Sequence, residues 1–384
     1  MRRNKRIVSG VMACVIMGLL VLGSALLLPV VAAHPGGGDG PASERGIRAV
    51  YTETNAAAGN AIVWYARARD GQLSWKGTVS AGGLGTDSGL GSQGALALGD
   101  DNRILVAVDA GSNELSVFRV SPGGLTLTDV VASGGIMPIS VTIHDDWVYV
   151  VNAGGETPNI AGFRLDGRGT LSAIPGSEQS LSGSGPAQIS FNPEGRVLVV
   201  TEKTTNSIDT FTVDHHGVAS GAISHASNGA VPFGFAFDED GHLIVSEAGG
   251  GPNGTSALSS YQVGHDGSLT TISASIPDFE YAACWVAVTN HGRFAYTSNA
   301  HPPSNDLSRY ELSDHGQLAL DQEVAAKPGN GPTDLGISGN GRFLYVLDSG
   351  DGALAGFLIH GDGTLSSVST ASGLPASDVG LVAT

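Results

Sequence analysis

Short apolar runs recur from residue 46 to the end of the chain, and bulky and small residues alternate within them. Successive side chains of a β-strand point to opposite faces, so a period of two predicts strands with one bulky and one small face. Bulky faces could then pack against small faces of neighbouring sheets. The bulky pairs are Leu96 and Leu98, Val141 and Ile143, Ile189 and Phe191, Phe235 and Phe237, Val286 and Val288, and Leu335 and Ile337; the small residues are Ala97, Thr142, Ser190, Ala236, Ala287, Gly336 and Gly380.

Two kinds of tight turn separate these strands, and both repeat. The first is an Asp-Gly or similar pair shortly before Leu or Val, as in Asp266-Gly267-Ser268-Leu269, and it occurs seven times. The second, such as Asn340-Gly341-Arg342, precedes an apolar run and occurs six times. Glycine beside Asp or Asn supplies the positive φ values that such turns require. The repeat length of about 48 residues is typical of a β-propeller blade.

The unequal counts of the two turns predict how the array closes. A seventh apolar run, Ala49-Val50-Tyr51, has no turn before it. The C-terminal segment Ala376–Leu381 resembles the first strand of a unit, yet no further strand follows it. We therefore expect an all-β, seven-bladed β-propeller with four antiparallel strands per blade, in which the C-terminal strand completes the first blade. The alternative is six blades and a separate N-terminal hairpin.

Composition narrows the class of protein further. Glycine accounts for 57 of 384 residues, and hydrophobic residues for 41%, which is enough to form a core. The chain has 19 basic and 36 acidic residues, for a net charge of −17. Nucleic-acid binding is not expected, because phosphate contacts require clustered Lys and Arg. The protein is expected to be an acidic monomer whose partner is a small molecule or an extracellular partner.

The N-terminal segment has the pattern of a secretory signal peptide. Four basic residues within Met1–Arg6 precede an apolar run that ends at Val31-Ala32-Ala33. We predict a signal peptide at residues 1–33, a flexible linker at 34–45 and the propeller at 46–384, with no membrane span after cleavage. An uncleaved anchor is the alternative. Cleavage would make the net charge −21, since it removes four basic residues and no acidic ones. A secreted or cell-envelope location follows.

The expected topology places two rings of residues at one mouth of the central channel. The first strands of the blades begin there and the second strands end there. The first ring is Ala95, Ser140, Gln188, Gly234, Trp285, Asp334 and Asp378; the second is Glu53, Asp109, Asn152, Glu202, Glu247, Asn299 and Asp348. These acidic groups could bind a divalent cation or act as general acid and base. Alternatively, they satisfy local backbone N–H groups. No cofactor and no metal ligand set is predicted from the sequence.

Cys284 and Trp285 form another local feature of this mouth. Trp285 begins its strand on the small-residue face, where it could form the wall of a pocket and stack on a ring-shaped ligand. The alternative is a tryptophan that fills space between two blades. Cys284 alternates with Val286 and Val288, so we expect a buried thiol rather than a nucleophile.

The repeats resemble the lactonase-type seven-bladed propellers, which include 6-phosphogluconolactonases and 3-carboxy-muconate lactonising enzymes. The resemblance rests on Leu344-Tyr345-Val346, Val148–Asn152, Gly185–Gln188 with Thr201-Glu202, and the Asp-Gly-x-Leu hairpins, and covers roughly residues 46–384. It is strongest for an exported lactonase-like subgroup. The family's Gly-Pro-Arg-His segment reads Gly185-Pro186-Ala187-Gln188 here, whereas the glutamate is kept as Glu202. The resemblance therefore implies a lactone hydrolase or cycloisomerase that lacks the groups for gripping an anionic substrate.

Two functional hypotheses follow. In the first, the protein hydrolyses a neutral lactone, with Glu202 as general base, Gln188 stabilising the oxyanion and Trp285 stacking on the substrate. Asp334, Asp378, Asp348 and Ser140 would line the same mouth and contact the ligand. In the second, the protein is a non-catalytic extracellular binding propeller for a protein, a glycan or a cell surface. A mouth plugged by side chains, or an exposed aromatic patch away from the channel, would favour the second hypothesis.

Overall fold

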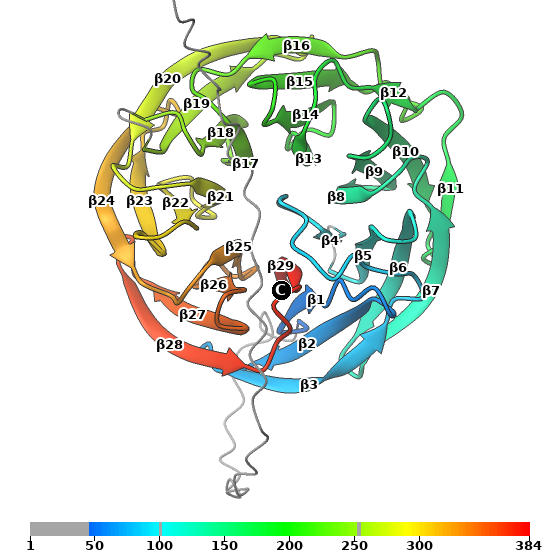
Figure 1. The fold of residues 1–384 in the computed structure, drawn as a ribbon, viewed down its shortest axis with the longest axis horizontal. Coiled ribbons are helices and arrows are strands. Elements are labelled where there is room, and N and C mark those ends of the chain that lie inside the picture. Colours follow the sequence, from blue (N-terminus) through cyan, green and yellow to red (C-terminus); the bar gives the residue numbers. More distant parts are fainter. Residues whose placement is uncertain (1–45, 100–101, 252–254) are drawn as a thin grey trace, which may run out of the picture.

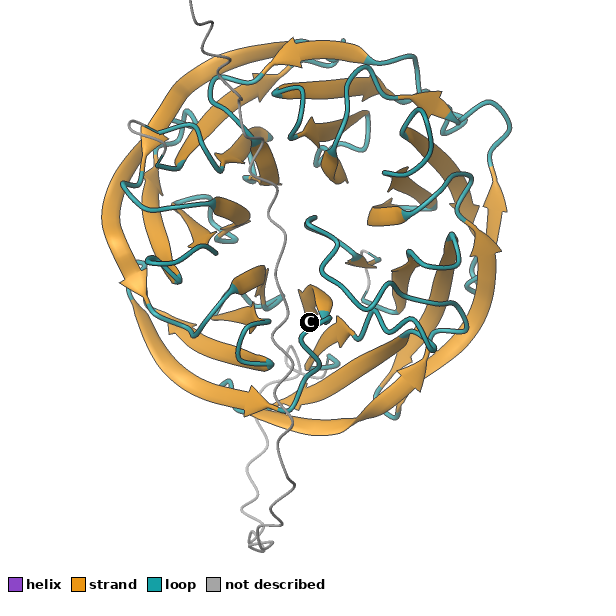
Figure 2. Ribbon diagram, viewed as in Figure 1, coloured by secondary structure: helices purple, strands orange, loops and turns teal. Residues whose placement is uncertain are grey.

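The computed structural model describes residues 46–99, 102–251 and 255–384, which form seven antiparallel sheets arranged in a ring, each with four strands in order and one with an additional short strand (Figure 1). Within these residues there is no helix (Figure 2), and hence none long and apolar enough to cross a membrane. The predicted seven-bladed propeller is confirmed. The predicted signal peptide and linker lie outside the described residues.

Each blade runs from an innermost strand, called strand A, to an outermost strand D. Blade 1 contains β29 (Val379–Ala383), β1 (Ala49–Glu53), β2 (Ala61–Arg67) and β3 (Leu73–Ser80). Blade 2 contains β4 (Leu96–Leu98), β5 (Ile104–Asp109), β6 (Glu114–Ser121) and β7 (Gly124–Ala132). Blade 3 contains β8 (Pro138–His144), β9 (Trp147–Asn152), β10 (Asn159–Leu165) and β11 (Leu171–Ala173), and β12 (Gln179–Ser180) also pairs with β10.

The remaining four blades follow the same order along the chain. Blade 4 contains β13 (Pro186–Phe191), β14 (Val197–Glu202), β15 (Ser207–Thr212) and β16 (Ile223–Ala226). Blade 5 contains β17 (Pro232–Phe237), β18 (His242–Glu247), β19 (Ala257–Val263) and β20 (Leu269–Pro277). Blade 6 contains β21 (Ala283–Val288), β22 (Phe294–Asn299), β23 (Asp306–Leu312) and β24 (Leu318–Ala326). Blade 7 contains β25 (Pro332–Ile337), β26 (Phe343–Asp348), β27 (Ala353–Ile359) and β28 (Leu365–Ser372).

The ring closes as the sequence predicts, because β29 pairs antiparallel with β1 as the innermost strand of blade 1. Figure 1 shows the C-terminus beside β1. The last residue ties the two chain ends together: the Thr384 carbonyl accepts a hydrogen bond from Arg67 (2.9 Å), and its hydroxyl accepts one from the Ala49 amide (2.8 Å). The alternative of six blades with a separate hairpin is therefore excluded.

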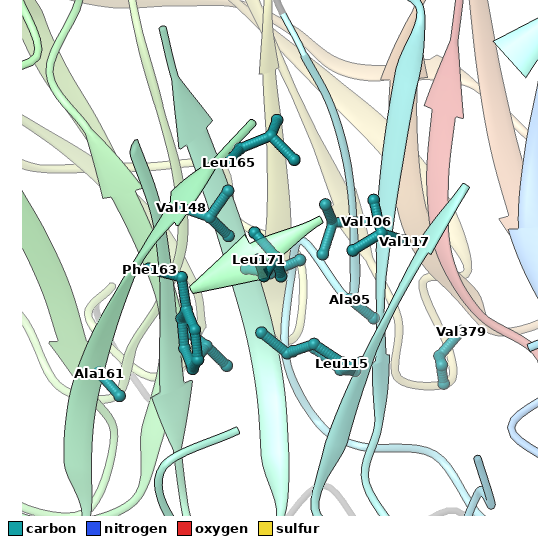
Figure 3. Close-up of a cluster of buried hydrophobic side chains, with 13 residues drawn as sticks. Ala95, Val106, Leu115, Val117, Val148, Ala161, Phe163, Leu165, Leu171 and Val379 are labelled. Atoms are coloured by element: carbon teal, nitrogen blue, oxygen red, sulfur yellow. The ribbon is translucent and has the colours of Figure 1, made fainter. Parts of the chain in front are cut away.

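The core lies between the blades. Small residues on strand A allow close approach, as predicted: a Cβ on Gly380 would lie 3.0 Å from Leu96 Cγ of the next blade. Figure 3 shows one interblade cluster, to which Phe163 and Leu171 of blade 3 and Leu115 of blade 2 belong. Burying such side chains contributes about 25 cal/mol per Å² of apolar surface removed from water.

Strand C carries one buried aromatic residue per blade, always opposite the second residue of strand B. Each packs in a hydrophobic cluster with residues of the preceding blade, or bonds to its backbone. The seven residues are Tyr65, Phe118, Phe163, Phe211, Tyr261, Tyr310 and Phe357. This repeated aromatic position makes departures at a single blade interface easy to recognise.

The residue just before strand A is held in a left-handed conformation at several blades. Gly331 adopts φ 63° before Pro332, and Val231 adopts φ 59° before Pro232. The conformation suits glycine, but it is strained for a β-branched residue. Two hydrogen bonds hold Val231 in place: its amide donates to Asn206 Oδ1 (2.7 Å), and its carbonyl accepts from the Ala248 amide (2.9 Å).

Replacing Val231 with glycine should therefore stabilise the protein. Strain at such a position destabilises the folded protein by about 1–3 kcal/mol, and glycine would remove it. Glycine also gives the unfolded chain more backbone freedom, which lowers stability by about 0.5–1 kcal/mol. We expect Val231→Gly to raise the free energy of unfolding by about 1 kcal/mol in denaturant titrations. Val231→Ala keeps a Cβ at positive φ and should not be stabilising. Equal stabilisation by both variants would contradict this explanation.

Candidate functional site

The residues of the two predicted rings can be located by their positions along the strands. The second ring consists of the last residue of strand B in all seven blades, and all seven side chains are buried. The first ring lies at the start of strand A, where Gln188 is opposite Thr201 and Asp334 is opposite Leu347. The repeat therefore places these residues at the expected positions. The contacts of their side chains indicate what each one does.

Glu202 is fully buried at the end of β14. Its Oε1 accepts a hydrogen bond from the Gly183 amide (3.0 Å), and its Oε2 accepts one from the Ser207 hydroxyl (2.7 Å). Burial is the main cause that raises the pKa of this carboxyl above its ordinary value, and the Ser207 hydrogen bond opposes the shift. A carboxylate with a raised pKa is suited to general-base catalysis near neutral pH.

Glu247, the matching residue of blade 5, has nearly the same surroundings. It accepts hydrogen bonds from the Gly229 amide (2.8 Å) and from Ser259 (2.6 Å) and Ser275 (2.6 Å). A Cβ on Gly229 would lie 2.2 Å from Glu247 Oε2, and one on Gly183 would lie 2.4 Å from Glu202 Oε2. Each carboxylate therefore fastens the loop that leads into its own blade. The local interpretation of the ring accounts for these contacts without a ligand.

A loop that the sequence did not single out crosses the mouth. It is the segment 84–94, called here the crossing segment, and Figure 1 shows it entering the middle of the ring ahead of β4. It starts on blade 1, where the Asn55 carbonyl accepts a hydrogen bond from the Asp87 amide (2.8 Å). It then bonds to blade 3 through Ser92 Oγ and the Ile139 carbonyl (2.8 Å), and to blade 4 through the Gln93 amide and the Ala187 carbonyl (3.0 Å).

Gln93 fastens the crossing segment to the far side of the channel. Its side-chain amide forms two hydrogen bonds with the backbone of Val286 in blade 6: Nε2 donates to the carbonyl (2.8 Å), and Oε1 accepts from the N–H (3.0 Å). Gln188 makes the same pair with Phe235 of blade 5, at 3.0 and 2.7 Å. Blade 5 has Gly234 at this ring position, so Gln93 supplies the bridge to blade 6 that a side chain of blade 5 would otherwise provide.

Gly234 makes room for this bridge. A Cβ at this position would lie 2.1 Å from Gln93 Oε1 and 2.5 Å from the Cys284 carbonyl oxygen. Gly234→Ala should therefore displace Gln93 and lower the free energy of unfolding by about 2 kcal/mol, the usual scale of overpacking in a buried site. Denaturant titration measures the loss, and limited proteolysis should cut the crossing segment faster than in the wild type.

A double-mutant cycle provides the control for this prediction. Gln93→Ala removes the closest atom, so Gly234→Ala should cost less in that background than in the wild type. Additive effects of the two substitutions would contradict the proposed contact.

Trp285 is buried beneath the crossing segment. Its Nε1 donates to the Ser92 carbonyl (2.9 Å), and its ring lies 5.1 Å from that of Phe233. Lys203, which follows Glu202, donates to the Gly91 carbonyl and lies over the Phe233 ring at 4.8 Å. The predicted stacking wall is therefore covered by residues 91 and 92 in this conformation.

A cavity of about 240 Å³ occupies the channel below the crossing segment. Gln93, Gln188 and Asp334 line it together with Thr142 and apolar residues of the A strands. Of the seven site residues predicted from the sequence, the cavity thus brings together Gln188 and Asp334. Glu202, Trp285, Asp378, Asp348 and Ser140 lie outside it; the Ser140 hydroxyl accepts a hydrogen bond from the Ile189 amide (3.1 Å). The functional roles of all seven stay predictions.

The acidic residues of the two rings at blades 7 and 1 are buried rather than solvated. Burial raises the pKa of Asp378 to about 8 and that of Asp348 to about 8, and it holds the pKa of Asp334 well above its usual range. In the described part of the chain, neither carboxyl oxygen of Asp378 has a hydrogen-bond partner. Burial therefore favours the neutral form of these three carboxyl groups.

A metal site would require several such groups to converge. Within residues 46–99, 102–251 and 255–384, no three His, Cys, Asp or Glu side chains are arranged to hold an ion. Cys284 is buried, as its alternation with apolar residues predicts.

The length of the loop between blades 1 and 2 could have revealed the crossing segment. Fifteen residues separate β3 from β4, whereas five separate β7 from β8, β16 from β17, β20 from β21, and β24 from β25. A loop of that length between propeller blades is frequently functional. Its path across the channel depends on Gly234 and Val286, which lie far away in the sequence.

Comparisons with known proteins agree with this architecture. The family model described as "Lactonase, 7-bladed beta-propeller" matches residues 159–277 and 257–377. A 6-phosphogluconolactonase of Yersinia pestis is 25% identical over 276 residues, covering 67% of this chain and 77% of the relative. Among solved structures, a protein from Lactobacillus plantarum gives a TM-score of 0.72 at 17% identity, covering 88% of this chain and 99% of its own. The periplasmic gluconolactonase of Pseudomonas aeruginosa gives 0.69 at 16%, covering 88% and 98%.

Proposed function

Because the chain belongs to the family of seven-bladed β-propeller lactonases, we propose that it hydrolyses a neutral lactone at the channel mouth. The observation that carries this proposal is the combination at blade 4. Glu202 has a raised pKa beside the mouth, while Ala187 and Gln188 stand where the family has arginine and histidine. The Yersinia relative is named for a phosphorylated lactone, and the Pseudomonas protein for a lactone without phosphate. Anionic groups are usually bound by arginine, so a neutral lactone suits this chain better.

The proposed reaction needs one base and one oxyanion donor. Glu202 accepts a proton as water attacks the lactone carbonyl carbon. The ring C–O ester bond then breaks, the proton passes to the alkoxide leaving group, and a hydroxy acid forms. Gln188 has one amide N–H bonded to Phe235, and its second N–H would donate to the oxyanion. Trp285 would stack on the ring, and Asp334, Asp378 and Asp348 would contribute neutral carboxyl groups near the substrate.

The reaction also requires the crossing segment to move, because its residues 91 and 92 cover Trp285. The segment has no regular secondary structure and is held by individual hydrogen bonds to five blades. Displacing it would expose Trp285 and open a path to Gln188. Loop opening of this kind controls access in many enzymes.

A second candidate is a binding propeller without catalysis. It is favoured by the covered Trp285 and by large apolar side chains exposed on loops that lead into strand A of three blades. These side chains are Leu84, Ile136, Met137, Phe279 and Tyr281. Exposed apolar groups that gather on one face commonly mark a protein contact. In either case we propose an exported monomer that needs no cofactor, and mass analysis of protein from the culture medium should find His34 at its N-terminus.

A substrate panel tests the proposed activity. Purified protein is assayed for acid release from glucono-1,5-lactone, galactono-1,4-lactone, γ-butyrolactone and 6-phosphoglucono-lactone, with spontaneous hydrolysis subtracted. We expect turnover of at least one neutral lactone, and a kcat/KM at least about 10-fold lower for the phosphorylated one. Failure to hydrolyse any neutral lactone would overturn the lactonase proposal and leave the binding candidate.

A further inference from the structure

The interface between blades 7 and 1 differs from the two other interfaces at which strand C carries a tyrosine. At two other interfaces a strand C tyrosine bonds to the preceding blade or the loop after it. The Tyr261 hydroxyl accepts a hydrogen bond from the Asn228 amide (3.0 Å), and the Tyr310 hydroxyl donates to the Ile276 carbonyl (3.0 Å). Tyr65 is the strand C aromatic residue of blade 1, and no hydrogen bond joins its hydroxyl to any of the described residues.

A cavity of about 420 Å³ opens where that bond would form. Tyr65 and Val63 of β2 line one side, Trp75 and Thr78 of β3 the outer side, and Ser372–Pro375 of blade 7 the opposite side, with Thr54 at one end. Tyr65 is 3% exposed, so it contributes a buried aromatic face and an unpaired hydroxyl to the cavity. The volume lies within the range of small-molecule sites, about 300–1,000 Å³.

Trp75 is unusual both in its exposure and in its position. It is 64% exposed, the highest value among the large hydrophobic residues of the described chain. It lies opposite Tyr65 on strand D, and the matching residues of five other blades are Leu127, Ala173, Thr271, Leu320 and Ser367. Leaving an indole ring in water carries a hydrophobic cost that a bound ligand would remove.

The lining determines the chemistry of the ligand. It combines an open indole face with the hydroxyl groups of Thr54, Tyr65, Thr78 and Ser372, and includes no charged side chain from the described residues. Without a cation the cavity does not suit an anion, and its many hydroxyls make it a poor site for a purely apolar ligand. A pyranose ring matches both features, because its C–H face packs on an aromatic ring while its hydroxyls exchange hydrogen bonds.

We propose that this cavity between blades 7 and 1 is a binding site for a neutral carbohydrate, with Trp75 as the stacking platform. The site is separate from the channel mouth and does not depend on lactone hydrolysis. It would let the protein attach to a glycan while the mouth stays available to another ligand.

Saturation-transfer NMR with four neutral disaccharides tests the proposal, namely maltose, cellobiose, lactose and N,N′-diacetylchitobiose. We expect at least one to receive saturation from the protein, and Trp75→Ala to reduce its affinity at least about 10-fold. Trp75→Tyr keeps an aromatic face and should retain part of the binding. Leu127→Ala, at the matching exposed position of blade 2, should change nothing. Thermal unfolding of each variant confirms that it is folded.

Three results would overturn the proposal. The first is no transfer to any of the four disaccharides. The second is binding that persists unchanged in folded Trp75→Ala. The third is preferential binding of an aromatic probe such as p-nitrophenol in place of every disaccharide. Lactone hydrolysis by the same preparations is measured separately, so that the outcome at the mouth and the outcome at this cavity are distinguishable.

Discussion

Glu202→Gln should lower kcat for a neutral lactone by at least about 100-fold while leaving the protein folded. General-base catalysis contributes roughly 10²–10⁴-fold, and an amide cannot accept the proton from water. The glutamine carbonyl can still accept the hydrogen bond from the Gly183 amide, and the Ser207 hydroxyl can reverse its role to accept from the amide group. Steady-state kinetics measure the loss of activity, and denaturant titration should show a change of less than about 1 kcal/mol.

Glu247→Gln is the matched control for this prediction. Glu247 ends strand B of the next blade and makes the same kind of contacts, to the Gly229 amide and to Ser259 and Ser275. If the carboxylates only fasten loops, the two variants should behave alike in both assays. If Glu202 is the base, only Glu202→Gln should lose activity. Equal activity of both variants with wild-type protein would remove Glu202 from the proposed mechanism.

The stability of the folded protein should fall as the pH rises from about 4 to about 8. Burial raises the pKa of Asp378 and Asp348 to about 8 and that of Asp109 and Asp278 to about 6. In the unfolded chain each carboxyl has a pKa of about 3.9. Between these limits the folded state holds a proton that the unfolded state has lost. Each group therefore lowers the free energy of unfolding by about 1.4 kcal/mol per pH unit in its own window. We expect a higher Tm at pH 5 than at pH 8.5.

Substitution of Asp378 isolates one of these groups. Asp378→Asn keeps the neutral form at every pH, so it should remove about 1.4 kcal/mol per pH unit of the slope between pH 4 and 8 and stabilise the protein at pH 8. Asp362→Asn is the control, because Asp362 is exposed in a hairpin where hydrogen bonds from Thr364 lower its pKa. That shift acts below pH 4. An unchanged slope in Asp378→Asn would contradict the buried, protonated state.

Most of the architecture could be predicted from local pattern, because each blade repeats the same turns and the same alternation. The Asp-Gly turns gave the C–D hairpins, and the position of Asp378-Val379 at the C-terminus gave the closure. The ring positions followed from register, so Glu202 at the end of strand B and Gln188 near the start of strand A have the predicted positions along their strands. The contacts of these side chains could not be predicted in the same way. Gln188 bridges to Phe235 of the next blade, and that contact depends on how the blades pack.

The crossing segment shows why the rest of the site escaped prediction. Gln93 bonds to Val286 across the channel. Its side chain fits there because residue 234 is glycine and has no Cβ. Neither Gln93 nor Gly234 is distinctive in the sequence. The two residues come into contact only in the closed ring. The cavity beside Tyr65 was not predictable for a similar reason, since Ser372–Pro375 of blade 7 line it opposite Tyr65 and lie about 300 residues away in the sequence.

The pairing of β29 with β1 also has a consequence for biosynthesis. Ribosomes make the N-terminal part first, so β1 keeps an unpaired edge until the last residues of the chain emerge. One wall of the cavity beside Tyr65 is formed by Ser372–Pro375, which precede β29 and are also made late. A nascent chain would therefore lack both the seal of the ring and the carbohydrate site until these residues have emerged. Ligand binding there would report that synthesis is complete, and it would favour the closed ring over molecules that exchange this strand with a neighbour.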